Sequence, residues 1–194
     1  MNNNARHIRE TLDSQSKELT RQIENTPFFI FLCGPSLDKT CSSAHLRKRI
    51  KESLEKEQFT VVLGEDEGLE ELRKEFGKDA QTNELNFISG PNCRAVILIA
   101  DSVGSHCELG LFNWLFASES SEYFDKNKIN FYVIADEKFK DDRSYFNEGP
   151  IKTLKDAKGS VEYCDFSSFD LSQIICELKG IRAREIKLSS NGNR

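Results

Sequence analysis

The sequence is poor in histidine and lacks the cysteine spacing that is typical of metal and redox motifs. It has three histidines, far apart along the chain, and six cysteines with no CxxC pair. Several of these cysteines sit inside apolar runs such as FIFLC and CRAVILIA, so we expect reduced, buried thiols and neither disulfides nor a zinc site. We also expect no resident cofactor. The chain has no GxGxxG, and CGPSLDKT lacks the GxxxxGK[ST] spacing of a phosphate loop.

Long apolar runs and a basic surface are missing as well. No run approaches the roughly 20 residues of a membrane span, and the polar N-terminus MNNNARHIRETLDSQ has no signal-peptide core. We therefore expect a cytoplasmic protein with no direct membrane association. The net charge is −5, whereas a general nucleic-acid binder needs a basic face. The basic cluster HLRKRIKESLEKE also carries acids, and we interpret it as the solvated side of a helix.

Apolar strands alternate with amphipathic helices along the whole chain. The expected strands are FFIFLC, FTVVLG, CRAVILIAD, NFYVIAD and SVEYCDF, and they are continuously apolar. That pattern predicts a parallel sheet covered on both faces, with CRAVILIAD at its centre. The fold class is therefore a doubly wound, mainly parallel five-stranded α/β domain of the flavodoxin or Rossmann type. We place an N-terminal helical segment at residues 1–26, the α/β domain at 27–184 and a flexible tail at 185–194.

The helices are predicted from apolar residues that recur every three or four positions. They lie before the first strand, in SSAHLRKRIKESLEKE, in GLEELRKEFG, in DAQTNELNFISG, after the central strand, in EGPIKTLKDAK and in SSFDLSQIICELKGIRAR. Asp79 is a candidate N-cap, and Pro150 is expected at the start of its short helix.

The candidate site follows from the ends of the strands. In open α/β sheets, ligands bind beyond the carboxyl ends of the strands, where the strand order reverses. The first strand ends in Cys33-Gly34-Pro35, the central strand in Asp101-Ser102-Val103-Gly104-Ser105, and the fourth in Asp136. Gly34 and Gly104 would let a ligand approach the backbone, and Glu108 would enter the crevice from the first turn of the next helix. Glu108 can also be read as an ordinary acid at a helix start, favoured by the helix dipole.

Three stretches together resemble the nucleoside 2-deoxyribosyltransferase-like fold: IFLCGP, TNELNFI and SVGSHCELG. A closer resemblance extends into the second half, where FLCG, GSHCELGLF and DEKFKDDRSYFNEGPIKTL are similar to the N-glycosidase effector proteins of bacterial retron anti-phage systems. The resemblance to the deoxyribosyltransferase-like family implies that Glu108 attacks the anomeric carbon of an N-riboside. It implies that Glu84 contacts the substrate near the reacting centre, and that Gly34 and Pro35 line the sugar pocket.

One departure from the deoxyribosyltransferases bears on the substrate. They carry an acid six residues before the nucleophile, and Ser102 stands there in this chain. Asp101 precedes it and would point to the other side of an extended strand. A base that leaves without protonation avoids the difficulty, and nicotinamide in NAD is such a base. We therefore expect an NAD- or nucleotide-consuming enzyme that cleaves an N-glycosidic bond.

Other residues are assigned less directly. The small residues Gly104 and Ser105 would let the sugar reach the turn. In FKDDRSYFNEGP, Arg143 would meet a phosphate and Asn147 a ribose hydroxyl, or the segment is a charged surface loop. Phe112 and Trp114 could stack on a base, although aromatic residues at helical spacing more often belong to the core.

Three hypotheses follow from these observations. The first is a defence enzyme that consumes NAD or a nucleotide, with a partner protein or nucleoprotein encoded in its operon. The second is a housekeeping nucleoside or nucleotide deoxyribosyltransferase or hydrolase, and the third is a non-catalytic nucleotide-sensing module. Relatives often complete a site with residues of a neighbouring subunit, so we expect a homo-oligomer that acts on a small molecule.

Overall fold

The computed structural model describes residues 3–66, 69, 79–118 and 128–191. Its contacts divide the chain into two compact units. The larger unit, Phe29–Leu171, contains the sheet and every predicted site residue, and the smaller one joins Met1–Phe28 to Ser172–Arg194. Among the described residues, no helix is both long and apolar enough to span a lipid bilayer.

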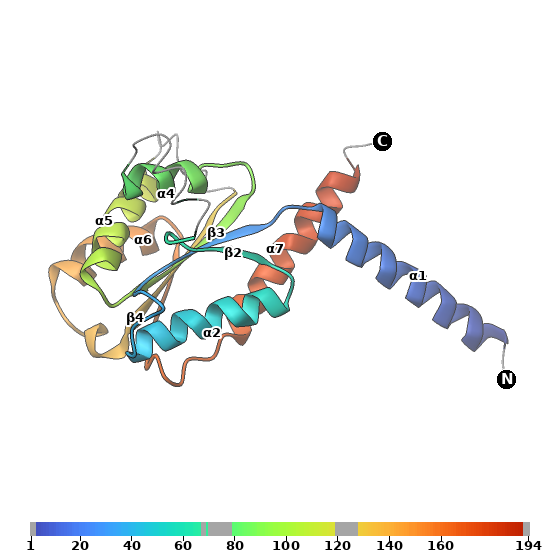
Figure 1. The fold of residues 1–194 in the computed structure, drawn as a ribbon, viewed down its shortest axis with the longest axis horizontal. Helices are drawn as coiled ribbons and strands as arrows, with labels where there is room; N and C mark the ends of the chain where they lie inside the picture. The colour runs from blue at the N-terminus through green and yellow to red at the C-terminus, as the bar shows by residue number, and fades with distance from the viewer. Residues whose placement is uncertain (1–2, 67–68, 70–78, 119–127, 192–194) are drawn as a thin grey trace. The chain divides into compact units, whose positions relative to one another are not determined.

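Five parallel strands form a single sheet in the order β2-β1-β3-β4-β5 (Figure 1). The strands are β1 (Phe29–Cys33), β2 (Thr60–Val62), β3 (Cys93–Ala100), β4 (Asn130–Asp136) and β5 (Ser160–Cys164). This is the flavodoxin-like strand order, and β1 and β3 flank the point where the order reverses. The predicted doubly wound α/β fold is therefore confirmed. CRAVILIA is the central strand, as its apolar composition indicated.

Helices cover both faces of the sheet. The helical elements of this unit are α2 (Ser42–Lys56), α4 (Ala80–Ile88), α5 (Val103–Ala117), η1 (Glu137–Phe139), η2 (Asn147–Ile151) and α6 (Lys152–Asp156). Figure 1 shows α2 on one side of the sheet and α4 and α5 on the other. The predicted cap of α4 is confirmed, because the Asp79 Oδ1 atom accepts a hydrogen bond from the Thr82 N–H at 2.7 Å.

The core follows the alternation of side chains along the strands. On the α4 and α5 side, Phe31, Val96 and Leu98 pack with Leu109 and Phe112 in one cluster of buried residues. Successive strand residues point to opposite faces, so the intervening residues face α2. These intervening residues include Ile30, Leu32, Ile97 and Ile99, all fully buried. Burial on both faces is the reason that the strands are continuously apolar rather than alternating.

The terminal helices form the smaller unit. They are α1 (Asn3–Asn25) and α7 (Ser172–Asn191), and they contact each other. The tail predicted from residue 185 begins inside α7, which continues as a helix to Asn191. The domain boundaries at residues 26 and 184 stay predictions.

Two details differ from the predictions. Pro150 does not start its helix but lies inside the π-helix η2, followed directly by α6. Proline has no N–H to donate to the i−4 carbonyl, and the wider π turn accommodates it at this point. The helix expected in GLEELRKEFG lies, apart from residue 69, outside the described residues.

The cysteines also differ in part. All six are free thiols, and Cys33 and Cys93 are buried in β1 and β3 as expected. Burial was the wrong expectation for Cys41, Cys107 and Cys176, which are exposed. These three lie outside the strands, where no second face of the sheet covers them.

Candidate active site

The carboxyl ends of β1 and β3 lie side by side and form the floor of the candidate site. Gly34 follows β1 with a φ of 150°, a conformation that side chains with a Cβ atom rarely adopt. A Cβ atom there would lie 3.1 Å from the Cβ of Ile99 on β3. The turn therefore needs glycine for two reasons, and it brings the buried Pro35 to the strand ends.

A buried arginine of α2 links the end of β1 to the segment that follows β2. The Arg47 guanidinium donates hydrogen bonds to the carbonyl oxygens of Leu32 at 2.8 Å and Pro35 at 3.1 Å. It also makes a two-pronged ion pair with the Glu65 carboxylate, at 2.6 and 2.9 Å. Arg47 is only 2 % exposed, so the interpretation of its segment as a solvated helix side is wrong at this position. The ion pair fixes a positive and a negative charge beside the ends of β1 and β2.

Glu108 lies in this charged environment and keeps an oxygen unpaired. Its Oε2 atom is buried and has no hydrogen-bond partner among the described residues. Burial raises the pKa of the Glu108 carboxyl above its usual range; the Arg47 guanidinium opposes the rise and the Glu65 carboxylate adds to it. A buried polar atom without a partner is uncommon and marks a place where a ligand or water completes the bonding.

The position of Glu108 within α5 corrects one expectation. The helix begins at Val103 after the N-cap Ser102, so Glu108 is in the second turn and not the first. The helix dipole acts mainly on the first turn. The main influence on the pKa of Glu108 is therefore burial, which favours the protonated form and raises the pKa.

Glu84 joins the same group of charges. A Cβ atom on Gly64, just after β2, would lie 2.5 Å from the Glu84 Oε1 atom. Burial raises the pKa of the Cys33 thiol well above its usual value, and the Glu108 and Glu84 carboxylates add to that rise. Both carboxylates are therefore close enough to the end of β1 to act on the same thiol. The structure thus gathers Glu84, Glu108, Gly34 and Pro35 at one edge of the sheet.

Ser102 and Ser105 form hydrogen bonds that cap the start of α5. The Ser102 Oγ atom accepts from the Ser105 N–H at 3.1 Å, and the Ser105 Oγ atom accepts from the Ser102 N–H at 2.9 Å. This reciprocal capping box satisfies two backbone donors. Ser105 is 1 % exposed, which leaves its hydroxyl committed to the cap. Gly104 is exposed, and a Cβ atom there would meet nothing closer than the Ser102 Oγ at 4.0 Å.

Asp101 directly follows β3, the strand next to β4 in the sheet. The Lys138 ammonium forms an ion pair with the Asp136 carboxylate at 2.8 Å. That hydrogen bond raises the pKa of Lys138, and the Asp101 carboxylate contributes further to the rise. Asp101 therefore belongs to a second group of charges at the strand ends, with Asp136 and Lys138.

The segment after β4 does not bring its predicted ligands to Glu108. The Asn147 amide donates to the carbonyl oxygens of Phe139 and of Asp142, the latter at 2.6 Å, and accepts from the Tyr163 hydroxyl at 2.6 Å. These bonds use the amide to hold the loop against β5. Arg143 is exposed and makes no ion pair or hydrogen bond within the described part of the chain.

The comparison with known families identifies the chain. Residues 43–193 match the family described as STM3845 retron effector protein, and this range includes Arg47, Glu65, Glu84 and Glu108. The chain belongs to this retron effector family. The resemblance of the sequence to retron effectors is thereby confirmed, while the wider resemblance to the deoxyribosyltransferase-like fold stays a prediction. No curated protein matches the chain.

Two residues of this retron effector's candidate site were missed from the sequence. Arg47 precedes Ile50 by three residues and Leu54 by seven, which places it on the buried stripe of α2. Glu65 comes directly after the end of the second strand and its glycine. Like the candidate residues after the first, central and fourth strands, Glu65 follows the carboxyl end of a strand. The rule that ligands bind beyond the strand ends therefore points to Glu65 as well.

Proposed function

We propose that this retron effector cleaves N-glycosidic bonds and that Glu108 is its nucleophile. The observation that carries the proposal is the buried, unpaired Oε2 atom of Glu108 at the switch point of the sheet. A buried carboxylate suits this chemistry because the transition state resembles an oxocarbenium ion and is stabilised by negative charge near the anomeric carbon. The raised pKa makes the carboxylate a stronger base than an exposed one and therefore a better nucleophile.

The reaction proceeds in two displacements. The Glu108 carboxylate forms a bond to the anomeric carbon C1′, and the bond from C1′ to the base nitrogen breaks with both electrons going to the nitrogen. Water then attacks C1′, the ester bond to Glu108 breaks, and the carboxylate is restored. Glu84, near the same strand end, is the group that we assign to take the proton from this water.

NAD is the substrate that we favour. Its nicotinamide leaves as a neutral molecule because the departing electron pair neutralises the pyridinium charge, so no general acid is needed. Ser102, at the position where the deoxyribosyltransferases carry an acid, has its hydroxyl in the capping box of α5. Arg47 does not disfavour a cationic ring in the site, since Glu65 balances its charge.

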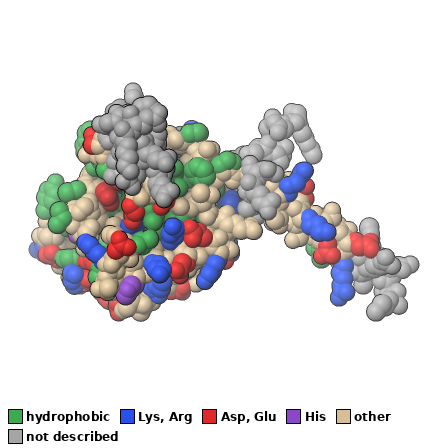
Figure 2. All heavy atoms as spheres, in the orientation of Figure 1, with side chains coloured by type: hydrophobic (Ala, Val, Ile, Leu, Met, Phe, Trp, Pro, Cys, Tyr) green, Lys and Arg blue, Asp and Glu red, His purple; other side chains and the backbone are tan. Residues whose placement is uncertain are grey.

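The family supports a role in anti-phage defence. Retron effector proteins act together with other components of their defence system, and we propose that such a partner restrains this enzyme. We also propose that the active form is a homo-oligomer. Figure 2 shows acidic and basic side chains interspersed on the visible face, which does not favour a purely electrostatic attachment to nucleic acid.

The deciding experiment measures release of free base. Wild-type protein and the variant Glu108→Gln are incubated with NAD and, separately, with a panel of nucleosides and nucleotides, and the products are separated by chromatography. We expect nicotinamide from the wild type and a loss of at least about a thousandfold in Glu108→Gln, as for other enzymes that lose a nucleophile. Acid quenching followed by mass spectrometry should detect a glycosyl ester on the peptide containing Glu108.

The matched control is Glu55→Gln, which removes an exposed carboxylate from α2. It should leave the rate unchanged. Release of another base from the panel would keep the reaction and replace the substrate. If neither the protein alone nor its mixture with the other retron components releases any base, the chain is a sensor module and the proposal fails.

A further inference from the structure

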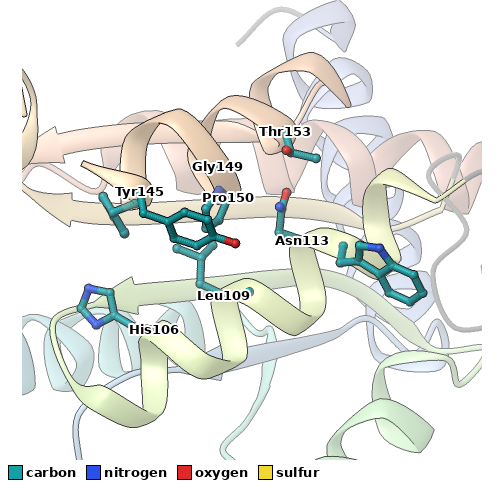
Figure 3. A pocket seen from close by; sticks show the side chains of 10 residues that line it. His106, Leu109, Asn113, Tyr145, Gly149, Pro150 and Thr153 are labelled. Atoms are coloured by element: carbon teal, nitrogen blue, oxygen red, sulfur yellow. The ribbon is translucent and has the colours of Figure 1, made fainter. Parts of the chain in front are cut away.

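A cavity of about 330 Å³ lies against α5 on the side that carries Asn113, and not on the side that carries Glu108. It is bounded by α5 and by the segment that runs through η2 into α6 (Figure 3). Its lining residues are His106, Leu109, Gly110, Asn113, Trp114, Tyr145, Phe146, Gly149, Pro150 and Thr153. The volume falls in the range of small-molecule sites, whose walls are mostly apolar with a few polar groups.

Asn113 places an unsatisfied polar group at this cavity. The residue is 4 % exposed, and its Oδ1 atom is buried without a hydrogen-bond partner among the described residues. Figure 3 shows the amide pointing from α5 toward the segment that carries Gly149, Pro150 and Thr153. Leaving a buried amide oxygen unpaired is costly. A ligand that donates a hydrogen bond to Asn113 would remove this cost.

Aromatic side chains provide stacking surfaces around the amide. Trp114 is 67 % exposed and Tyr145 is 86 % exposed, although both are large apolar residues. Phe146 lies against the His106 ring, with ring centroids 5.4 Å apart. Exposed aromatics that gather at the mouth of a pocket typically mark a binding site. Of the two stacking candidates in the sequence, Trp114 is exposed at this cavity, whereas Phe112 is fully buried in the core.

The backbone on the far wall is fixed and unusual. Gly149 and Pro150 belong to the π-helix η2, a type of turn that often occurs at functional sites. At its start, Asn147 anchors the chain to the Phe139 and Asp142 carbonyl oxygens and to the Tyr163 hydroxyl. The wall is therefore held in place by hydrogen bonds before any ligand arrives.

The charge of the lining restricts the ligand. Among the described residues, no Lys, Arg, Asp or Glu lines the cavity. The His106 Nδ1 atom lies 2.6 Å from the Ser102 carbonyl oxygen, to which it donates. In the tautomer with its proton on Nδ1, the ring leaves Nε2 as an acceptor. A phosphate or carboxylate would find no cation here, whereas a neutral ring with N–H donors would find acceptors and stacking surfaces.

We propose that this cavity binds a neutral, planar, nitrogen-containing aromatic ring, such as a nucleobase, which stacks on Trp114 and Tyr145 and donates a hydrogen bond to Asn113. The site is separate from Glu108, because residues 108 and 113 are about 140° apart around a helix with 3.6 residues per turn. The proposal does not depend on the activity assigned to Glu108.

The single tryptophan allows a direct test. Trp114 is the only tryptophan of the chain, so stacking of a base on it should quench the whole indole fluorescence signal. The protein is titrated with adenosine, cytidine and guanosine, and separately with a single-stranded oligodeoxyadenylate, which distinguishes a free base from a base in a strand. We expect saturable quenching by at least one of them, unchanged in Glu108→Gln.

Matched ligands and variants locate the contact. N6,N6-dimethyladenosine lacks the amino donor of adenosine and should bind the wild type about tenfold more weakly if that donor meets Asn113. Asn113→Leu should weaken the binding of adenosine by a similar factor. This variant should bind adenosine and N6,N6-dimethyladenosine with equal affinity. The change removes an unpaired buried polar atom, so it should not impair folding. Guanosine and cytidine provide the corresponding donors if adenosine does not bind.

A pocket-filling variant completes the test. A Cβ atom on Gly110 would meet no atom within 4 Å, so Gly110→Leu can project into the cavity. Replacing glycine in a helix also improves helix propensity, and loss of quenching then reports a blocked site and not unfolding. Val103→Ala, at an exposed position outside the lining, should retain binding. Absence of saturable quenching by every ligand, or full binding by Gly110→Leu, would overturn the proposal.

Discussion

The two sides of α5 present opposite chemistry. On one side Glu108 lies near the Arg47–Glu65 ion pair at the strand ends, and both charges of that pair act on the pKa of Glu108. On the other side Asn113 lies in a cavity that has several aromatic rings and, in the part of the chain that the structure describes, no charged lining residue. The same fifteen-residue helix therefore carries both the site proposed for a developing positive charge and the site proposed for a neutral ring.

The two sides share one property. Each contains a buried side-chain oxygen without a partner among the described residues: the Oε2 atom of Glu108 and the Oδ1 atom of Asn113. A buried polar atom without a hydrogen-bond partner lowers stability, so such atoms are expected mainly at residues that are kept for function. What differs is the charge around each oxygen, and the charge decides which ligand can satisfy it.

The largest expected difference in unfolding free energy is between substitutions on the core side of α5 and on its outer side. Phe112 is fully buried between α5 and the sheet, whereas Trp114 is 67 % exposed. Phe112→Ala should lower the free energy of unfolding by about 3–5 kcal/mol, because it leaves a cavity in the core. Trp114→Ala should change it by no more than about 0.5 kcal/mol. Denaturant unfolding measures both, and equal losses would contradict the assignment of Trp114 to an open surface.

The next largest effect is expected from removing the positive charge of Arg47, on the Glu108 side of α5. Arg47 is buried but its partner Glu65 is about half exposed, so the pair lies between the buried and exposed classes. Arg47→Met should therefore cost about 2 kcal/mol of unfolding free energy. It should also raise the pKa of Glu108 further, since the guanidinium opposes that rise. A shift of the acid limb of the activity profile to higher pH would report this change.

The control for this variant is Arg143→Met, which removes an exposed arginine with no ion pair in the described part of the chain. It should leave both the unfolding free energy and the pH profile unchanged. Quenching of Trp114 by a base should be the same in both arginine variants. If Arg47→Met abolished that quenching, the two sides of α5 would not be independent.

A smaller effect on stability is expected at the N-terminal cap of α5, the helix that carries both Glu108 and Asn113. Ser102→Ala removes the acceptor of the Ser105 N–H and should cost about 1 kcal/mol. Ser89→Ala, at an exposed position after α4, should stay within about 0.5 kcal/mol. Unfolding curves of the two variants make the comparison. A neutral result for Ser102→Ala would mean that the Ser105 hydroxyl alone secures the start of α5.

The smallest effect is a gain of stability at Glu108. Because burial raises its pKa in the folded state, the stability that its protonation contributes is complete below the usual carboxyl value and is lost as the pH rises through the raised pKa. Glu108→Gln should therefore be more stable than the wild type at neutral pH. The difference should shrink as the pH falls through the raised pKa toward 4.5, the ordinary value for this group, and stay constant below it. Denaturation midpoints measured across pH test this, and a neutral-pH loss would contradict it.

Much of the fold could be predicted because it depends on local pattern. The continuously apolar strands indicated a sheet covered on both faces, and the most apolar of them is central. The rule that ligands bind beyond the carboxyl ends of the strands placed Gly34 and Glu108 at adjoining strand ends. It could not place Asn147, whose amide is used by backbone groups of its own loop and by Tyr163. Which partner an amide finds depends on contacts that no sequence spacing defines.

The sequence by itself determined the parallel α/β fold and the edge of the sheet where charged residues gather, because hydrophobic periodicity fixes which faces are buried. Only the tertiary structure decided that Arg47 is buried against Glu65, that Glu108 has a raised pKa, and that Trp114 opens onto a cavity while Phe112 does not. Desolvation and pairing depend on what each side chain meets across the fold, and those neighbours are distant in the chain.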